Sequence, residues 1–252
     1  MDLFFELHQD IPREGPGEAA STRRAFALMN GLPSQPRILD IGCGPGMQTL
    51  ELARISAGSI LAIDTHAPFL EALARRASRE GLAKQISVRN QSMFALGFEP
   101  GSFDVIWSEG AIYIIGFEKG LREWKPFLKN GGYLAVTELS WLKPDPPAEV
   151  KTFWQENYPH IQTREENLAL LQKAGYRAVG HFTLPESAWW QDYYNPSEKR
   201  IAMLTEKYRD NDEALAFLDI SQREIDLYRR YSEWYGYVFY VMQKVDDNSV
   251  EN

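Results

Sequence analysis

The chain has 252 residues, a formal net charge of −8 and a single cysteine, Cys43. This length suits one α/β domain with added elements, and the single cysteine excludes an intrachain disulfide. An acidic chain does not favour a nucleic-acid partner, because such partners usually meet a basic surface. The four histidines are too widely scattered to indicate a metal site. No apolar run approaches the ~20 residues that span a membrane, and the N-terminus lacks signal-peptide features, so we expect a cytoplasmic protein.

The N-terminal 35 residues predict an arm followed by a helix. An amphipathic start leads into a loop rich in proline and glycine at 11–17. Ser21 is a suitable N-cap for a helix that ends near Asn30.

From residue 37, apolar strands alternate with helices. The predicted strands are 37–41, 59–64, 86–88, 103–108 and 133–139, and the predicted helices are 48–56, 68–79 and 117–128. Trp124 and Leu128 should face inward, and residues 130–132 should form a sharp turn before the fifth strand. Such alternation with short loops implies a parallel sheet with helices on both faces.

The last third is less regular. Prolines end the fifth strand at 144–147, and a capping box of Thr163 and Glu166 opens a helix to residue 174. A sixth strand is predicted at about 175–184. Residues 186–232 form an insertion of two or more helices rich in Tyr and Trp, 235–244 form the final strand, and 246–252 should be frayed.

The most specific pattern is the segment ILDIGCGPGMQT at residues 38–49. Glycines at 42, 44 and 46 follow a strand and precede a helix, which lets backbone approach a ligand closely. Asp64 ends the next strand, where a carboxylate can accept hydrogen bonds from ribose hydroxyls. Met47 stands where a dinucleotide fingerprint has its third glycine, and no P-loop is present. The pattern therefore predicts a nucleoside site.

This segment resembles motif I of the class I S-adenosylmethionine-dependent methyltransferases, over 37–139 strongly and to residue 245 more loosely. The resemblance implies a doubly wound, mostly parallel α/β sheet of seven strands with a Rossmann-like fold. Its last strand would be antiparallel, between the fifth and sixth, after a helical insertion. The implied cofactor is S-adenosylmethionine, with S-adenosylhomocysteine as product. The acceptor would be a small molecule, because the layout is similar to the ubiquinone/menaquinone-biosynthesis and methyltransferase domain 11/25 type.

The resemblance also implies cofactor-binding residues. Asp40 would hold the methionine portion, Asp64 the ribose, and Thr65 would flank the adenine. Ser92 replaces the acid that the family usually places near adenine, and Ser108 lies where backbone passes the sulfonium. Arg13 belongs to a loop, 13–17, that would cover the cofactor. The full set is Asp40, Gly42, Cys43, Gly44, Gly46, Asp64, Thr65, Ser92, Met93, Ser108 and Arg13.

For catalysis, Glu109 is the first candidate base, because open α/β sheets bind ligands at the carboxyl ends of their strands. Its alternative role is a structural carboxylate paired with Arg13 or another cation. Tyr113 is a second catalytic candidate, since aromatic faces suit a sulfonium methyl group. His8 and Glu138 are further candidate bases. The predicted substrate pocket comprises Phe4, His8, Glu138, Trp141, Trp189 and Trp190, with Tyr193 and Tyr194 nearby.

We expect one domain, 1–252, in which the arm 1–35 and the insertion 186–232 form a cap on the acceptor side. The aromatic residues 189–194 have two alternative roles, as core or as a homodimer interface. Two other functions stay open: an NAD(P)-dependent oxidoreductase, and a non-catalytic protein that binds S-adenosylmethionine. The sequence does not indicate the acceptor, the methylated atom or the oligomeric state.

Overall fold

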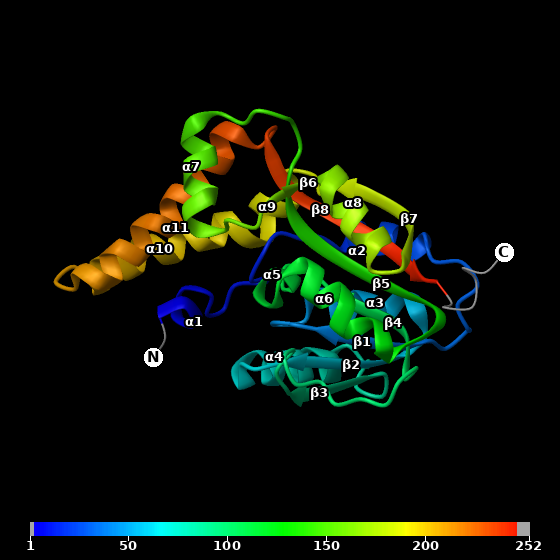
Figure 1. Ribbon diagram of the computed structural model, residues 1–252. Helices are drawn as coiled ribbons and strands as arrows, with labels where there is room; N and C mark the ends of the chain where they lie inside the picture. Colours follow the sequence, from blue (N-terminus) through cyan, green and yellow to red (C-terminus); the bar gives the residue numbers. More distant parts are fainter. Residues whose placement is uncertain (1–2, 246–252) are drawn as a thin grey trace.

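The computed structural model describes residues 3–245 of the chain (Figure 1). Its strands are β1 Arg37–Ile41, β2 Ser59–Asp64, β3 Ile86–Asn90, β4 Phe103–Ser108, β5 Leu128–Trp141, β6 Gln162–Thr163, β7 Tyr176–Thr183 and β8 Tyr235–Lys244. Its α-helices are α1 Leu3–Leu7, α2 Ala19–Ala27, α3 Met47–Ser56, α4 Ala67–Arg79, α5 Ile112–Ile115, α6 Phe117–Trp124, α7 Ala148–Asn157, α8 Arg164–Lys173, α9 Ser187–Trp189, α10 Asn195–Lys207 and α11 Asp212–Tyr231. A 3-10 turn spans Lys125–Phe127, and a π-helical turn spans Trp190–Tyr194.

The strands form one sheet in the order β3-β2-β1-β4-β5-β8-β7, and the short β6 pairs with the end of β5. Strands β1 to β5 pair in parallel, whereas β8 runs antiparallel to both β5 and β7. The predicted fold class is therefore confirmed, including the antiparallel last strand. The order reverses direction at β1 and β4, and the carboxyl ends of those two strands are where open α/β sheets place ligands.

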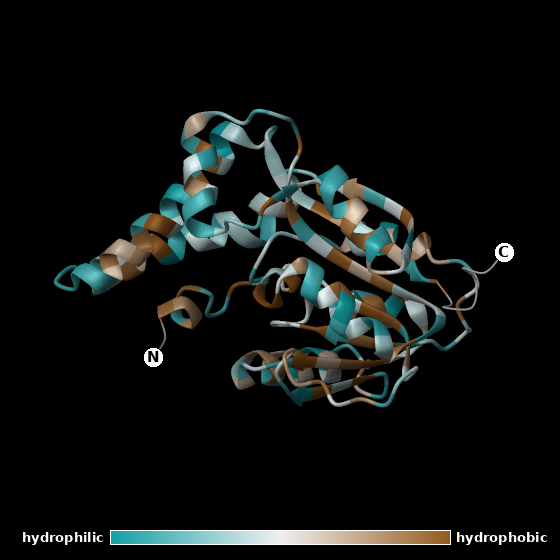
Figure 2. Ribbon diagram, viewed as in Figure 1, coloured by the Kyte–Doolittle hydropathy of each residue, from teal (hydrophilic) through white to brown (hydrophobic). Residues whose placement is uncertain are grey.

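Helices cover both faces of the sheet. Residues of α2, α3 and α4 pack with one face, and residues of α5, α6 and α8 pack with the other. Strand β4 is buried along its whole length, which explains the unbroken apolar character that parallel strands show when they are covered on both sides. Figure 2 shows hydrophobic residues concentrated in the central strands.

The remaining helices, α1, α7 and α9 to α11, gather beyond one end of the sheet (Figure 1). They share a third hydrophobic cluster that includes Leu7, Trp154, Trp189 and Tyr228. Helix α1 is joined to the end of α10 by Glu6, whose carboxylate accepts hydrogen bonds from Lys207 and Tyr208. The N-terminal arm and the insertion thus contact each other, as the predicted cap requires. The domain boundaries themselves stay a prediction.

Several element boundaries differ from the sequence prediction. Helix α2 begins at Ala19, and Glu18 precedes it, so Ser21 lies inside the helix rather than at its cap. The amides of Ser21 and Thr22 donate to the carbonyl of Glu18, so the first turn of the helix forms there. Helix α6 ends at Trp124 because Pro126 follows, and Leu128 already belongs to β5. Trp124 and Leu128 are both fully buried, as predicted.

Strand β5 is longer than predicted at both ends. Residues 130–132 form a bulge within it rather than a turn before it, because Phe103 pairs with Leu128 and Val105 with Tyr133. Helix α7 was not predicted, and neither were the short elements α5 and β6. The capping box of Thr163 and Glu166 is confirmed, with both reciprocal hydrogen bonds present. The predicted frayed end at 246–252 lies outside the described residues. Among the helices within 3–245, none has the length and apolar composition of a membrane span.

Candidate functional site

The glycine turn after β1 is held against the end of β2. The amides of Gly42 and Cys43 both donate to the carbonyl of Ile63, at 2.9 and 3.0 Å. Gly46 has φ of 84°, and a Cβ there would lie 2.3 Å from Cδ1 of Leu73, so helix α4 packs directly on the turn. Gly44 also has a positive φ, of 51°, and its backbone lines a cavity. The turn thus combines close packing behind it with bare backbone in front.

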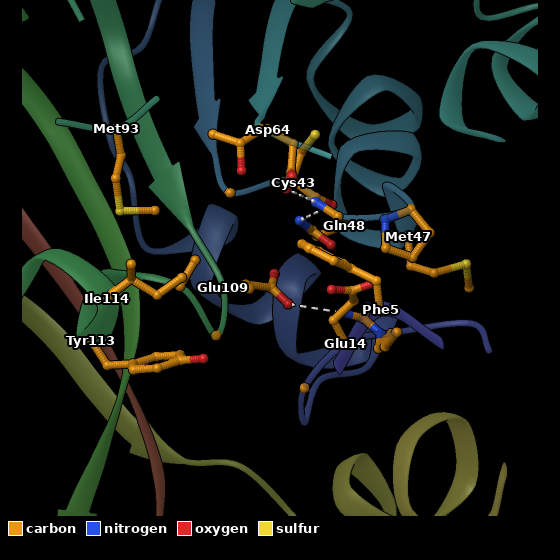
Figure 3. A pocket seen from close by; sticks show the side chains of 18 of the residues that line it. Phe5, Glu14, Cys43, Met47, Gln48, Asp64, Met93, Glu109, Tyr113 and Ile114 are labelled. Atoms are coloured by element: carbon orange, nitrogen blue, oxygen red, sulfur yellow. Dashed lines mark hydrogen bonds and ion pairs between the residues drawn. The ribbon is translucent and has the colours of Figure 1, made fainter. Parts of the chain in front are cut away.

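This cavity, the turn cavity, has a volume of about 210 Å³ and lies at the carboxyl ends of β1, β2 and β4 (Figure 3). It contains eight of the predicted cofactor residues: Gly42, Cys43, Gly44, Asp64, Thr65, Ser92, Met93 and Arg13. It is further lined by Phe4, Phe5, Pro12, Glu14, Gly15, Pro16, Pro45, Met47, Gln48, Gln91, Phe94, Glu109, Gly110, Ala111, Tyr113 and Ile114.

Asp64 is fixed by the backbone of the turn and of its own loop. Its Oδ2 accepts from the amide of Gly44 and its Oδ1 from the amide of His66, each at 2.9 Å. Each carboxylate oxygen has a second lone pair, so both oxygens can still accept from a ligand. Met93 extends its side chain toward the same space from the loop after β3 (Figure 3). The structure therefore brings together the residues expected to meet a ribose and an adenine.

Glu14 adds a second carboxyl group to the turn cavity. Its Cγ would lie 3.5 Å from a Cβ placed on Gly44, and its Oε1 has no hydrogen-bond partner within the described residues. Burial, together with the nearby carboxylate of Asp64, raises the pKa of Glu14 to about 9. The sequence predicted only that its loop would cover the cofactor; nothing in the sequence marked this residue. An unpartnered buried carboxyl group facing a cavity is a position that a ligand would complete.

Glu109 and Arg13 form a buried ion pair, with 3.1 Å between Oε2 and the guanidinium. The other carboxylate oxygen, Oε1, accepts from the hydroxyl of Thr22 at 2.7 Å and from the indole of Trp107 at 3.0 Å. Figure 3 shows Glu109 at the cavity wall. Three donors on one carboxylate favour the structural role for Glu109 over the role of a general base. Arg13 accordingly binds a carboxylate of the protein.

Three predicted cofactor residues do not line the turn cavity. Asp40 is fully buried and accepts from the hydroxyl of Thr49 at 2.5 Å; burial raises its pKa to about 7. Gly46 faces Leu73, and Ser108 donates its hydroxyl to the carbonyl of Ile41 at 2.9 Å. In this conformation these residues support the turn and the neighbouring strand ends instead of contacting the cavity.

A second cavity, the aromatic cavity, also has a volume of about 210 Å³ and adjoins the first. The two share Phe4, Glu14, Gly15, Pro16, Gly110 and Tyr113. The aromatic cavity is completed by Leu139, Trp154, Asn157, Tyr158, Trp189, Tyr193, Glu224 and Tyr237. A Cβ on Gly15 would lie 3.9 Å from Cα of Gly110, so two backbones approach closely where the cavities meet. A group bound in one cavity can thus lie next to a group bound in the other.

Of the predicted substrate-pocket residues, Phe4 and Trp189 line the aromatic cavity. His8 is buried beside it: its Nδ1 lies 2.8 Å from the carbonyl of Phe4 and its ring stacks with Tyr193. Burial lowers the pKa of His8. Trp141 packs against Tyr235 in the core, and Trp190 lies under the guanidinium of Arg229 beside a different cavity. Neither tryptophan lines the aromatic cavity: Trp141 is the last residue of β5, and Trp190 begins the π-helical turn and lines the other cavity.

Glu138 lies behind the aromatic cavity and does not line it. The hydroxyl of Tyr158 donates to its Oε1 at 2.6 Å, and its Oε2 has no partner among the described residues. Burial raises the pKa of Glu138 to about 8. Tyr113 lines both cavities, and Figure 3 shows its side chain at the wall of the turn cavity. Its pKa is raised to about 12 by burial and by nearby carboxyl groups, so it stays protonated near neutral pH.

Sequence reasoning missed Trp154, Asn157 and Tyr158 because it missed α7, which carries the first two and is followed directly by the third. It also missed Glu224 on α11 and Tyr237 on β8. A signal for α7 existed, since a proline just before a helix is common and Pro147 precedes apolar residues at helical spacing. Within residues 3–245, no group of three or more His, Cys, Asp or Glu side chains is arranged to hold a metal ion.

Comparisons with known proteins agree with this geometry. Residues 38–132 match the family described as a methyltransferase domain. The 27-O-demethylrifamycin SV methyltransferase of Amycolatopsis mediterranei is 27% identical over 91% of this chain and 85% of its own length. The chain spans 32–55% of the length of the first three curated relatives that it matches.

Two solved structures share the fold. A S-adenosylmethionine-dependent methyltransferase from Thiobacillus denitrificans, in complex with S-adenosylhomocysteine, aligns with a TM-score of 0.80 and 21% identity, covering 96% of this chain and 98% of that one. The [4+2]-cyclase SpnF aligns with a TM-score of 0.73 and 20% identity, covering 96% and 92%. Residues 38–132 are thus a methyltransferase domain of the 25 type, and the whole chain has the fold of the class I S-adenosylmethionine-dependent methyltransferases, as the glycine turn predicted.

Proposed function

We propose that the chain binds S-adenosylmethionine in the turn cavity and transfers its methyl group to a small molecule in the aromatic cavity. The observation that carries this proposal is the charge of the turn cavity. Among the described residues that line it, four belong to the charged types: Arg13, Glu14, Asp64 and Glu109. The other ionisable residues of the lining are Cys43 and Tyr113. Arg13 is neutralised by Glu109, which leaves the carboxyl groups of Glu14 and Asp64.

Two carboxyl groups without a cationic partner suit a ligand that is itself positive. S-adenosylmethionine carries a sulfonium, an ammonium and a carboxylate group and is positive overall, whereas the pyrophosphate of NAD or NADP is anionic. Opposite charges lower the free energy of binding in a buried site, and like charges raise it. The charge therefore supports the methyl donor over the dinucleotide, and the alternative of an oxidoreductase is not favoured.

Each residue of the turn cavity has a role in this proposal. Asp64 accepts from the ribose hydroxyls, Gly44 offers its backbone to the ribose and methionine segment, and Met93 lies against the adenine. Ser92 can accept from the adenine amino group, as expected from the sequence. Glu14 lies where it can stabilise a positive group of the cofactor.

The aromatic cavity supports a small-molecule acceptor because it shares a wall with the turn cavity. Transfer is an in-line displacement: the acceptor attacks the methyl carbon, and the bond between that carbon and sulfur breaks. Holding both reactants next to each other removes much of the entropic barrier. Tyr113 and Gly110 lie where the two cavities meet, so they would border the transferred methyl group.

We also expect the protein to act in the cytoplasm.

Isothermal titration calorimetry with S-adenosylmethionine, S-adenosylhomocysteine, NAD and NADP tests the cofactor. Saturable binding of the two sulfur nucleosides, with no binding of the dinucleotides, is the expected result. Binding of NAD or NADP alone would refute the proposal. Transfer of label from methyl-labelled cofactor to a metabolite extract then distinguishes an enzyme from a protein that only binds the cofactor.

A further inference from the structure

The aromatic cavity combines two chemical features that the transfer of a methyl group does not itself require. Half of its fourteen lining residues are aromatic, from five separate parts of the chain. Two more, Glu14 and Glu224, carry carboxyl groups, and none of the described lining residues is Lys, Arg or His. A cavity built only for an apolar acceptor would have no use for buried acids, because burying a carboxylate without a partner costs free energy.

Glu224 is the acid that the cofactor does not explain. It projects from α11 into the aromatic cavity and is absent from the lining of the turn cavity. The hydroxyl of Tyr194 donates to its Oε1 at 2.9 Å, which holds the side chain in one orientation. Burial raises the pKa of Glu224 above its ordinary value, and a cation bound beside it would favour the ionised carboxylate.

The aromatic rings that line this cavity together with Glu224 meet one another at several angles. Tyr113 and Tyr158 meet edge to face, with 6.1 Å between their ring centroids. The ring centroids of Trp189 and Tyr237 lie 5.3 Å apart. Electron-rich ring faces attract cations, and ammonium ligands are bound in this way in aromatic cages. A carboxylate at one side of such a cage adds a charged hydrogen bond for an N–H group.

We propose that the acceptor is a small molecule carrying an aliphatic ammonium group, held between these rings and the Glu224 carboxylate, so that the transferred methyl group goes to nitrogen. This inference rests on the proposed function for the methyl donor alone. A protonated amine has no free electron pair, so its proton first passes to the Glu224 carboxylate. The nitrogen electron pair then forms the new bond to the methyl carbon, and the electron pair of the broken bond to carbon stays on sulfur, which gives neutral S-adenosylhomocysteine.

The test uses choline as a cationic probe and its uncharged analogue in which a tert-butyl group replaces the trimethylammonium group. The two probes have nearly the same shape, so a difference in affinity reports the charge. Both are titrated into the protein alone and into the protein saturated with S-adenosylhomocysteine, with calorimetry as the readout. We expect choline to bind at least tenfold more tightly than the uncharged analogue in one or both states.

The variant Glu224→Gln keeps an oxygen that can accept from Tyr194 but removes the negative charge. It should weaken choline binding about tenfold and leave S-adenosylhomocysteine binding and the uncharged analogue unaffected. The matched control is Asp219→Asn, which removes a charge from an exposed position on the same helix and should change nothing.

Equal affinity for the two probes, no binding of choline in either state, or unchanged choline binding by Glu224→Gln would each overturn the inference. Failure of S-adenosylhomocysteine to bind would instead refute the proposed methyl donor. Because the probes are also titrated into the protein alone, these two failures are distinguishable.

Discussion

Oε2 of Glu109 lies 3.1 Å from the guanidinium of Arg13, and both side chains are buried. The two residues are 96 positions apart, so this contact fastens the N-terminal loop to the end of β4. Glu14 and Gly15, which follow Arg13 directly, line both cavities. The ion pair therefore holds in place the segment that separates the two predicted reactants.

Breaking this pair should destabilise the protein strongly. Glu109→Gln keeps an acceptor for Thr22 and Trp107 but turns an amide toward Arg13, and Arg13→Gln leaves the carboxylate without its cation. Removal of one partner from a buried pair costs about 3–5 kcal/mol of unfolding free energy. Urea denaturation of the two single variants should show this loss, and the double variant should lose less than their sum.

The same variants decide between the two roles of Glu109. If it positions the loop, Arg13→Gln and Glu109→Gln should lower turnover by similar factors. A turnover that is abolished in Glu109→Gln yet nearly normal in Arg13→Gln would show instead that Glu109 is the general base.

Replacing Asp64 with alanine should weaken binding of S-adenosylhomocysteine. The variant loses the acceptor proposed for the ribose hydroxyls and also the bond from the Gly44 amide. Hydrogen bonds to a charged group contribute about 1.5–3 kcal/mol each, which sets the expected loss in binding free energy. Calorimetry measures it, with Asp219→Ala on the exposed side of α11 as the control. An unchanged affinity would remove Asp64 from the proposed site.

The sheet and the turn cavity could be predicted from local sequence because local rules determine them. Apolar strands, a glycine turn and an acid at the end of the next strand are adjacent in sequence, and parallel strands bring their carboxyl ends to one edge. Strands β2, β4 and β8 accordingly begin and end where predicted, at 59–64, 103–108 and 235–244.

The aromatic cavity was harder to predict because its walls come from segments far apart in the chain. Tyr113, Tyr158 and Glu224 meet only after α7 and α11 have packed over the end of the sheet. The abundance of tyrosine and tryptophan showed that these segments are apolar without showing which side chains face the cavity. Trp189 and Trp190 illustrate this, since they are neighbours in sequence and line different cavities.

The stability of the ligand-free protein should fall as the pH rises from weakly acidic to weakly alkaline. The pKa values of Glu14, Glu138 and Asp40 are raised to about 9, 8 and 7 in the folded protein. Between the ordinary pKa of each group and these values, the folded state binds more protons than the unfolded state. The free energy of unfolding therefore decreases with pH over this window, and each contribution levels off above the raised pKa.

Thermal unfolding between pH 5 and pH 9 checks this slope. In Glu14→Gln the melting temperature should stop falling at a lower pH than in the unchanged protein. The reason is that the folded-state pKa of Glu14, about 9, is the highest of the three. S-adenosylmethionine should bind more tightly as the pH rises, because a cation beside Glu14 favours the ionised carboxylate. A melting temperature that rises steadily over this range would contradict the prediction.

The glycines of the turn should separate stability from binding. Gly46→Ala places a Cβ 2.3 Å from Leu73 Cδ1 at a φ of 84°, whereas Gly44→Ala places one 3.5 Å from Glu14 Cγ at a φ of 51°. Left-handed backbone costs an alanine about 1–2 kcal/mol in both variants. Only Gly46→Ala adds the overpacking cost of about 1–3 kcal/mol, so urea denaturation should find it the less stable variant. Gly44→Ala should fold but bind S-adenosylhomocysteine more weakly, because its methyl group enters the turn cavity where bare backbone meets the ligand. Equal stability of the two variants, or full affinity in Gly44→Ala, would mean that the turn packs or binds differently from the structure described.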